Sequence, residues 1–161
     1  MQKPTFRIAF LTHEPFFPPS GGGSAEAVYL VEELVRRGHE VHIFCPQIED
    51  PKKVEQRFQV RLHQFSKWKM GRYAKMRNVK YLLYPFSLER MVLAASREIN
   101  FDLVLSQHAI SAVAAGKLKQ RLKIPVVMNF PDLLNFPRQV PKLTRLGRAT
   151  EIPSFIEASE T

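Results

Sequence analysis

The feature that most constrains the fold is a glycine-rich turn that joins an apolar run to an amphipathic helix. Residues 6–11 are predicted to form a buried strand, and the turn that follows contains Gly21, Gly22 and Gly23. Apolar spacing predicts a helix over residues 24–37, with Ser24 or Gly23 as its N-cap. A second predicted strand, 41–45, begins only a few residues later. These elements predict a β-α-β unit with parallel strands and a right-handed crossover.

The remaining predicted elements alternate in a similar way. Strands are expected at 58–63, 102–106 and 124–130, and a helix at 110–122. Another helix is expected after Pro85, with Ser87 as its cap. The order β-α-β-β-α-β-α-β predicts an α/β domain: a Rossmann-like open, mostly parallel sheet with helices on both faces. We expect this domain at residues 1–134 and a weakly defined tail at 135–161.

Composition excludes several classes of protein. The chain has 161 residues, of which 45% are hydrophobic, which is enough for a core. No apolar run approaches the ~20 residues of a transmembrane helix, and the start lacks the pattern of a secretory signal peptide. The single cysteine, Cys45, excludes an internal disulfide and a multi-cysteine zinc site, and we expect it to be a small core residue. A cytoplasmic location is therefore expected.

The formal net charge of +9 is concentrated in one segment. Residues 66–80 contain six Lys and Arg and no acidic residue, interleaved with apolar side chains. Such a segment can lie on an anionic bilayer, where each cation contributes about 1 kcal/mol. The expected membrane contacts are Lys67, Trp68, Lys69 and Arg72, at the inner face of the membrane. A solvated insertion is the alternative, and no pattern of a nucleic-acid-binding module accompanies the charge.

The glycine turn is the first candidate ligand site. In an open parallel sheet, ligands bind beyond the carboxyl ends of the strands, and the turn follows the first strand directly. Glycines let a ligand approach the backbone, and a helix N-terminus attracts anions; a tight connection without a ligand is the alternative. The turn is not a dinucleotide fingerprint, because Glu26 replaces the third glycine, and no Walker A sequence is present.

Several segments together resemble one known family. Residues 7–15 read RIAFLTHEP, residues 18–23 read PPSGGG, and residues 34–41 read LVRRGHEV. Further segments are FDLV at 101–104 and KIPVVMNFPDL at 123–133. Over about residues 6–134, the chain resembles the N-terminal domain of family 4 glycosyltransferases, which have the GT-B fold.

The resemblance implies an activity and a set of site residues. It implies retaining transfer of a sugar from a nucleotide-sugar donor to a glycan or lipid-linked acceptor. The nucleotide-sugar is then a substrate, and no cofactor or metal is expected. The resemblance places Gly21, Gly22 and Gly23 near the donor sugar and phosphate, with Glu14 and Ser24 on the rim.

Two positions depart from the family pattern. Where the family often has His-Asp after its fifth strand, this chain has Pro131 and Asp132, so the role of that histidine is unfilled. The resemblance still places Asp132 among the residues that bind the donor or the acceptor. At the end of the fourth strand, His108 stands one place later than the family's histidine. It is expected either to contact a substrate or to cap a helix or face solvent. His42 and His63 are expected on strand faces turned to solvent or to a partner, and no metal-ligand spacing is present.

The resemblance covers only half of such an enzyme. The donor-binding domain with its Glu-x7-Glu pattern is missing, so we expect the chain to be inactive alone and to require a C-terminal domain or partner chain. The main hypothesis is therefore the acceptor-side half of a glycosyltransferase. The alternative is a non-catalytic subunit that anchors or recruits a catalytic chain at the membrane. A fragment of a related sugar-nucleotide epimerase is a third option.

Overall fold

A computed structural model describes residues 4–65 and 77–129 of the chain. Its elements strictly alternate between strand and helix. The strands are β1 (Arg7–Leu11), β2 (Glu40–Pro46), β3 (Arg61–Phe65), β4 (Leu103–Gln107) and β5 (Val126–Asn129). The helices are α1 (Gly22–Arg36), α2 (Pro51–Phe58), α3 (Arg77–Ala95) and α4 (His108–Leu122).

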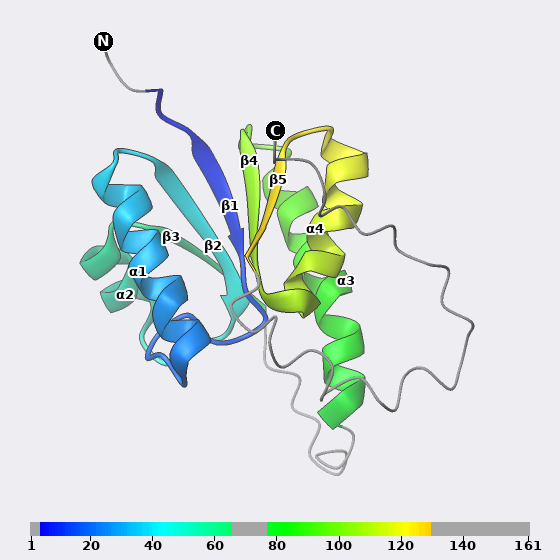
Figure 1. Cartoon of the computed structure of the whole chain (residues 1–161), viewed down its shortest axis with the longest axis horizontal. Helices are drawn as coiled ribbons and strands as arrows, with labels where there is room; N and C mark the ends of the chain where they lie inside the picture. The colour runs from blue at the N-terminus through cyan, green and yellow to red at the C-terminus, as the bar shows by residue number, and fades with distance from the viewer. Residues whose placement is uncertain (1–3, 66–76, 130–161) are drawn as a thin grey trace, which may run out of the picture. The chain divides into compact units, whose positions relative to one another are not determined.

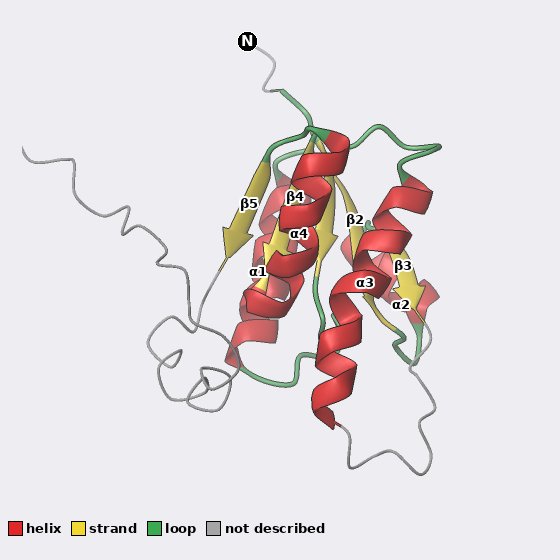
Figure 2. Ribbon diagram, turned by 90° about the vertical axis from the view of Figure 1, so that its right-hand side faces the viewer, coloured by secondary structure: helices red, strands yellow, loops and turns green. Residues whose placement is uncertain are grey.

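The five strands form one parallel sheet in the order β3-β2-β1-β4-β5. Helices α1 and α2 lie on one face and α3 and α4 on the other, which is visible when Figures 1 and 2 are compared. The Rossmann-like α/β prediction is therefore confirmed. Between β1 and β4 the strand order reverses direction, and this switch point is where open parallel sheets form a ligand crevice.

Side chains that alternate along the strands divide the core into two parts. Ile8, Phe10 and Ile43 pack toward the first helix pair, together with Val31 of α1 and Phe58 of α2. The neighbouring strand residues point the other way, so that Ala9, Leu11 and Phe44 pack with Leu88 of α3 and Leu118 of α4. Both faces of the central strands are thus buried, which explains why these strands read as continuous apolar runs.

Helix α1 begins earlier than its sequence pattern indicates. Gly21 is the N-cap, and Gly22 and Gly23 already belong to the first turn, so the prediction of Ser24 or Gly23 as the cap was wrong. The helix ends as expected, because Gly38 has a φ of 89° and its N–H bonds the carbonyl of Val35. This left-handed glycine forms the usual C-terminal stop.

Two helices differ from the sequence predictions. Helix α2 was not predicted, and its residues were expected to precede a strand at 58–63; the strand β3 begins only at Arg61. Helix α3 begins at Arg77, so Pro85 lies inside the helix and not before it. The Ser87 hydroxyl does not cap a helix start; it donates to the Leu83 carbonyl one turn earlier, at 3.4 Å.

The strand histidines also differ from expectation. His42 is 1% exposed, so the prediction of a solvent- or partner-facing position was wrong. Its two ring nitrogens lie 3.0 Å from Glu40 Oε1 and 3.0 Å from His63 Nε2. Burial lowers the pKa of His63, and the hydrogen bond from His42 lowers the pKa of Glu40. These three residues form a structural polar chain within the sheet.

Candidate functional site at the switch point of the sheet

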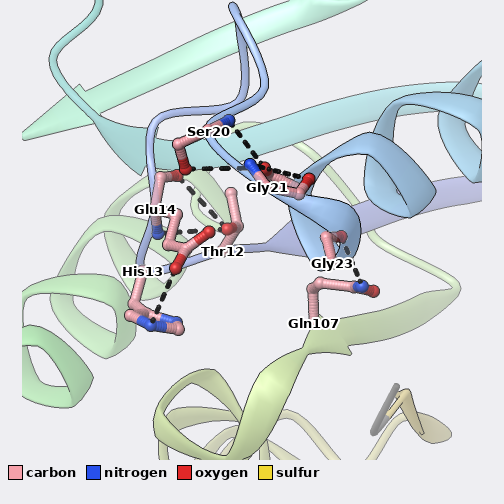
Figure 3. A network of polar contacts seen from close by, with 8 residues as sticks. Thr12, His13, Glu14, Ser20, Gly21, Gly23 and Gln107 are labelled. Atoms are coloured by element: carbon pink, nitrogen blue, oxygen red, sulfur yellow. Dashed lines mark hydrogen bonds and ion pairs between the residues drawn. The ribbon is translucent and has the colours of Figure 1, made fainter. Parts of the chain in front are cut away.

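The candidate site is formed where β1 and β4 end beside the start of α1. The loop after β1 contributes Thr12, His13 and Glu14, and the β4–α4 junction contributes Gln107 and His108. Figure 3 shows Thr12, His13, Glu14 and Gln107 around the glycine turn. Parallel strands place their carboxyl ends at one edge, so residues more than 80 positions apart in sequence meet here.

The first two glycines of the turn are open to solvent. Gly21 and Gly22 are exposed, and a Cβ added to either would meet no atom within 4 Å. Because Gly22 and Gly23 begin a helix, their N–H groups have no carbonyl one turn earlier to bond. Glu26 lies beyond the first turn of α1, so no acidic side chain in that turn competes with an anionic ligand for the free N–H groups.

Gly23 differs from its neighbours because another side chain fills the space that its Cβ would take. A Cβ added there would lie 2.4 Å from Cε1 of His108, a contact that cannot exist without movement. The absence of a side chain at Gly23 therefore lets α1 approach the start of α4. In the glycine turn, only Gly21 and Gly22 offer space to a ligand.

Ser24 is buried and holds the turn in shape. Its hydroxyl oxygen accepts hydrogen bonds from the N–H groups of Ser20, at 2.8 Å, and Gly21, at 2.9 Å. The same hydroxyl lies 2.9 Å from the Gly21 carbonyl and donates to it. Ser24 was expected on the rim of the site, whereas its hydrogen bonds give it a structural role beneath the glycines.

A chain of amide side chains connects α1 to β4 and β5. The buried Gln107 donates from Nε2 to the Gly23 carbonyl at 3.2 Å. Its oxygen accepts a hydrogen bond from Asn129 Nδ2 at 3.1 Å. Asn129 also donates to Glu26 Oε1 at 3.0 Å. These bonds fix the glycine turn relative to the two strands on the far side of the switch point.

Two imidazole rings meet at the floor of the site. The His13 and His108 ring centroids lie 5.4 Å apart in an edge-to-face arrangement. The His13 side chain is only 10% exposed. Burial, and to a smaller extent the charge of His108, lower the pKa of His13 to about 4, so this ring is neutral at pH 7. Glu14 Oε1 lies 3.9 Å from His13 Nε2.

His108 has an unusual backbone and an unsatisfied ring nitrogen. Its φ of 67° is a left-handed conformation that is uncommon for residues other than glycine. Its Nε2 is buried without a hydrogen-bond partner in the described part of the chain, as are the hydroxyls of Ser106 and Ser111. Strained backbone and unpaired buried polar groups are features that gather at functional sites.

The structure brings together most of the residues predicted for the site. Gly21, Gly22, Gly23, Ser24 and His108 lie around the switch point, and Glu14 lies on the adjoining loop. The remaining predicted residues lie outside the described residues: Asp132 and the expected membrane contacts Lys67, Trp68, Lys69 and Arg72.

Sequence reasoning missed His13, Gln107 and Asn129. Each of them stands at or just after the carboxyl end of a strand of the parallel sheet, and that position was the available signal. The described residues contain no group of three or more His, Cys, Asp or Glu side chains that could hold a metal ion. None of the described helices is both long and apolar enough to cross a bilayer.

The fold and the site define an open α/β domain whose candidate ligand crevice lies at the switch point of a parallel sheet. The chain belongs to the family described as Glycosyl transferase 4-like domain, which it matches over residues 21–159. The resemblance found from the sequence is therefore confirmed. No curated protein sequence matches the chain.

Solved structures with the GT-B fold resemble the chain. CalG4, the calicheamicin glycosyltransferase, is 20% identical with a TM-score of 0.57, over 78% of this chain and 30% of that chain. MurG of Acinetobacter baumannii is 17% identical with a TM-score of 0.53, and the match covers 98% of this chain and 44% of MurG. Anabaena Alr3699/HepE, solved with UDP and glucose, is 16% identical with a TM-score of 0.54, and the match covers 83% of this chain and 32% of Alr3699/HepE. This chain thus spans less than half the length of each.

Proposed function

We propose that this chain forms the acceptor-side half of a glycosyltransferase and that its glycine turn contacts the sugar-phosphate part of a nucleotide-sugar donor. The observation that carries the proposal is the exposed pair Gly21 and Gly22 at the start of α1, on the switch point of the sheet. Helix N–H groups and the positive end of the helix dipole there attract a phosphate.

The surroundings of the turn support an anionic ligand. The turn is held from below by Ser24 and Gln107, so its backbone is already ordered before a ligand arrives. A preorganised site loses less entropy on binding than a flexible loop does. The solved Alr3699/HepE complex, whose fold this chain resembles, holds UDP and glucose, which is consistent with a nucleotide-sugar donor.

The finer parts of the proposal come from the family resemblance. They are a retaining outcome, a glycan or lipid-linked acceptor, and the need for a second, donor-binding half. A single half-cleft cannot hold both substrates and exclude water, so we expect no sugar transfer by these 161 residues alone. The configuration of the product formed with a second half would test the retaining outcome.

The test is a titration of the chain with UDP-glucose and GDP-mannose, followed by the backbone amide signals in NMR. We expect weak but saturable shifts at Gly21 and Gly22 with a preferred nucleotide-sugar, because the chain alone supplies only the part of the donor site that contacts the sugar-phosphate. Gly22→Val should abolish these shifts, because a branched side chain fills the open space above the helix N–H groups. Gly116→Val is the matched control, since Gly116 is also a helical glycine with open space around it.

Two results would contradict the proposal. One is binding that survives Gly22→Val in a folded variant, because the glycine turn would then be only a connection. The other is sugar transfer by the chain alone, because the requirement for a second half would then be wrong. Urea denaturation of both variants separates loss of binding from loss of folding.

A further inference from the structure

A cavity of about 220 Å³ lies apart from the glycine turn, beside the carboxyl end of β2. Its walls come from three segments that the fold brings together. The loop after β1 contributes Phe17 and Pro18, the turn before α2 contributes Glu49 and Asp50, and α2 itself contributes Val54 among others. Pockets for drug-sized ligands usually measure about 300–1,000 Å³, so this one suits a single small ring.

Arg57 gives the cavity a fixed hydrogen-bond donor. Its guanidinium carbon lies 5.0 Å from the ring centroid of Phe17 and 5.0 Å from that of Phe58. Contacts with two aromatic rings orient the guanidinium, and it forms no ion pair with any described residue. Its N–H groups are therefore available to a ligand that enters the cavity.

Two carboxylates and a second cation complete the polar lining. Asp50 is the N-cap residue of α2, yet its side chain makes no capping hydrogen bond. Glu49 precedes it, and Lys53 follows in the first turn of the helix. The four charged side chains of the lining thus balance, with two hydrogen-bond acceptors and two donors.

This combination discriminates between classes of small ligand. An apolar wall of Phe17, Pro18 and Val54 suits the C–H face of a pyranose ring, and the charged groups suit its hydroxyls. The formal charges of the lining sum to zero, so it offers a phosphate dianion no excess of positive charge. A sugar hydroxyl can use both kinds of group, since it donates and accepts.

We propose that this cavity is a binding subsite for one sugar ring. That this ring belongs to the acceptor rests on the function proposed above. The geometry supports the link, because the loop between β1 and α1 supplies both Phe17 of the cavity and the glycine turn. A sugar in the cavity would contact Phe17, and the donor phosphate would contact Gly21 and Gly22 at the end of the same loop.

The experiment titrates the full chain with methyl glycosides of glucose, galactose, mannose and N-acetylglucosamine and follows its amide NMR signals. We expect at least one glycoside to give saturable shifts at Phe17, Val54 and Arg57. Arg57→Ala and Asp50→Asn should each weaken that binding by about tenfold, the effect expected for one lost charge-assisted hydrogen bond. Arg90→Ala is the matched control, since Arg90 is also an exposed helical arginine and lies outside the cavity.

The outcomes separate this proposal from the proposed function. No saturable shift with any glycoside, a stronger response to inorganic phosphate, or unchanged affinity in both folded variants would each overturn the sugar subsite. UDP-glucose is titrated in parallel, and its shifts are expected at Gly21 and Gly22. Glycoside binding without UDP-glucose binding would leave the subsite in place and contradict the donor site, and the reverse result would contradict the subsite alone.

Discussion

The buried histidine at the candidate site predicts how the stability of the domain depends on pH. The folded structure lowers the pKa of His13 from 6.5 to about 4, mainly through burial and secondarily through the charge of His108. Its neutral form is therefore favoured in the folded state. The stability that the neutral His13 contributes is fully present above pH 6.5. It is lost as the pH falls toward 4, because the His13 ring takes up a proton in the unfolded chain before it does so in the folded one.

The magnitude follows from the size of the shift. One pKa unit corresponds to about 1.4 kcal/mol, so the lowering of the His13 pKa corresponds to about 3 kcal/mol of stability. A domain of this size has a total stability of about 5–15 kcal/mol, so a loss of this size is measurable. His13→Gln removes the titrating group and should flatten the stability curve between pH 6.5 and 4 by a similar amount.

The assay is urea unfolding of the wild type and of His13→Gln at intervals from pH 7 to pH 4. The difference between the two curves isolates His13, because Glu40 and His63 also have lowered pKa values and titrate in both proteins. In His108→Gln the His13 pKa should rise only partway, since burial is the larger cause. Parallel curves, or a His13 signal in NMR that titrates near 6.5, would refute the reasoning.

Three further predictions concern the glycine turn, Cys45 and the basic segment. Gly23→Ala should cost about 1–3 kcal/mol in urea unfolding because its Cβ meets His108, whereas Gly22→Ala, which meets nothing, should be neutral or stabilising; equal effects would contradict the contact. Cys45 should resist thiol reagents until the chain unfolds, because it is buried and burial raises its pKa to about 12; rapid labelling of the folded chain would contradict this. From the sequence alone, the chain should float with anionic liposomes and the triple variant of Lys67, Lys69 and Arg72 to Ala should not; failure of the wild type to float would exclude the anchoring alternative.

The sheet was predictable because its strands are encoded locally. Each central strand is buried on both faces, so its apolar run stands out against the charged helix surfaces. Helix α2 was not predictable in the same way, because only Val54 and Phe58 of its eight residues are buried. The start of α3 was misplaced because a proline usually marks the first turn of a helix, whereas Pro85 lies in the interior.

The candidate site was predictable only where one segment forms it. The glycine turn could be found because its residues are consecutive and follow a strand. The hydrogen bonds of Gln107 to Gly23 and to Asn129 depend on which strands become neighbours, and a single sequence does not encode that locally. The burial of His13 likewise arises from the meeting of two loops, so its lowered pKa had no sequence signal.

The close approach of Gly23 to the imidazole of His108 has a consequence for evolution. A side chain at Gly23 would force the ring of His108 to move, because the space beside the Gly23 backbone is already filled by that ring. Homologous chains that carry alanine or serine at the first position should therefore carry a smaller residue at the second. We expect positions 23 and 108 to covary. In an alignment of relatives, a larger side chain at position 23 should accompany a smaller one at position 108.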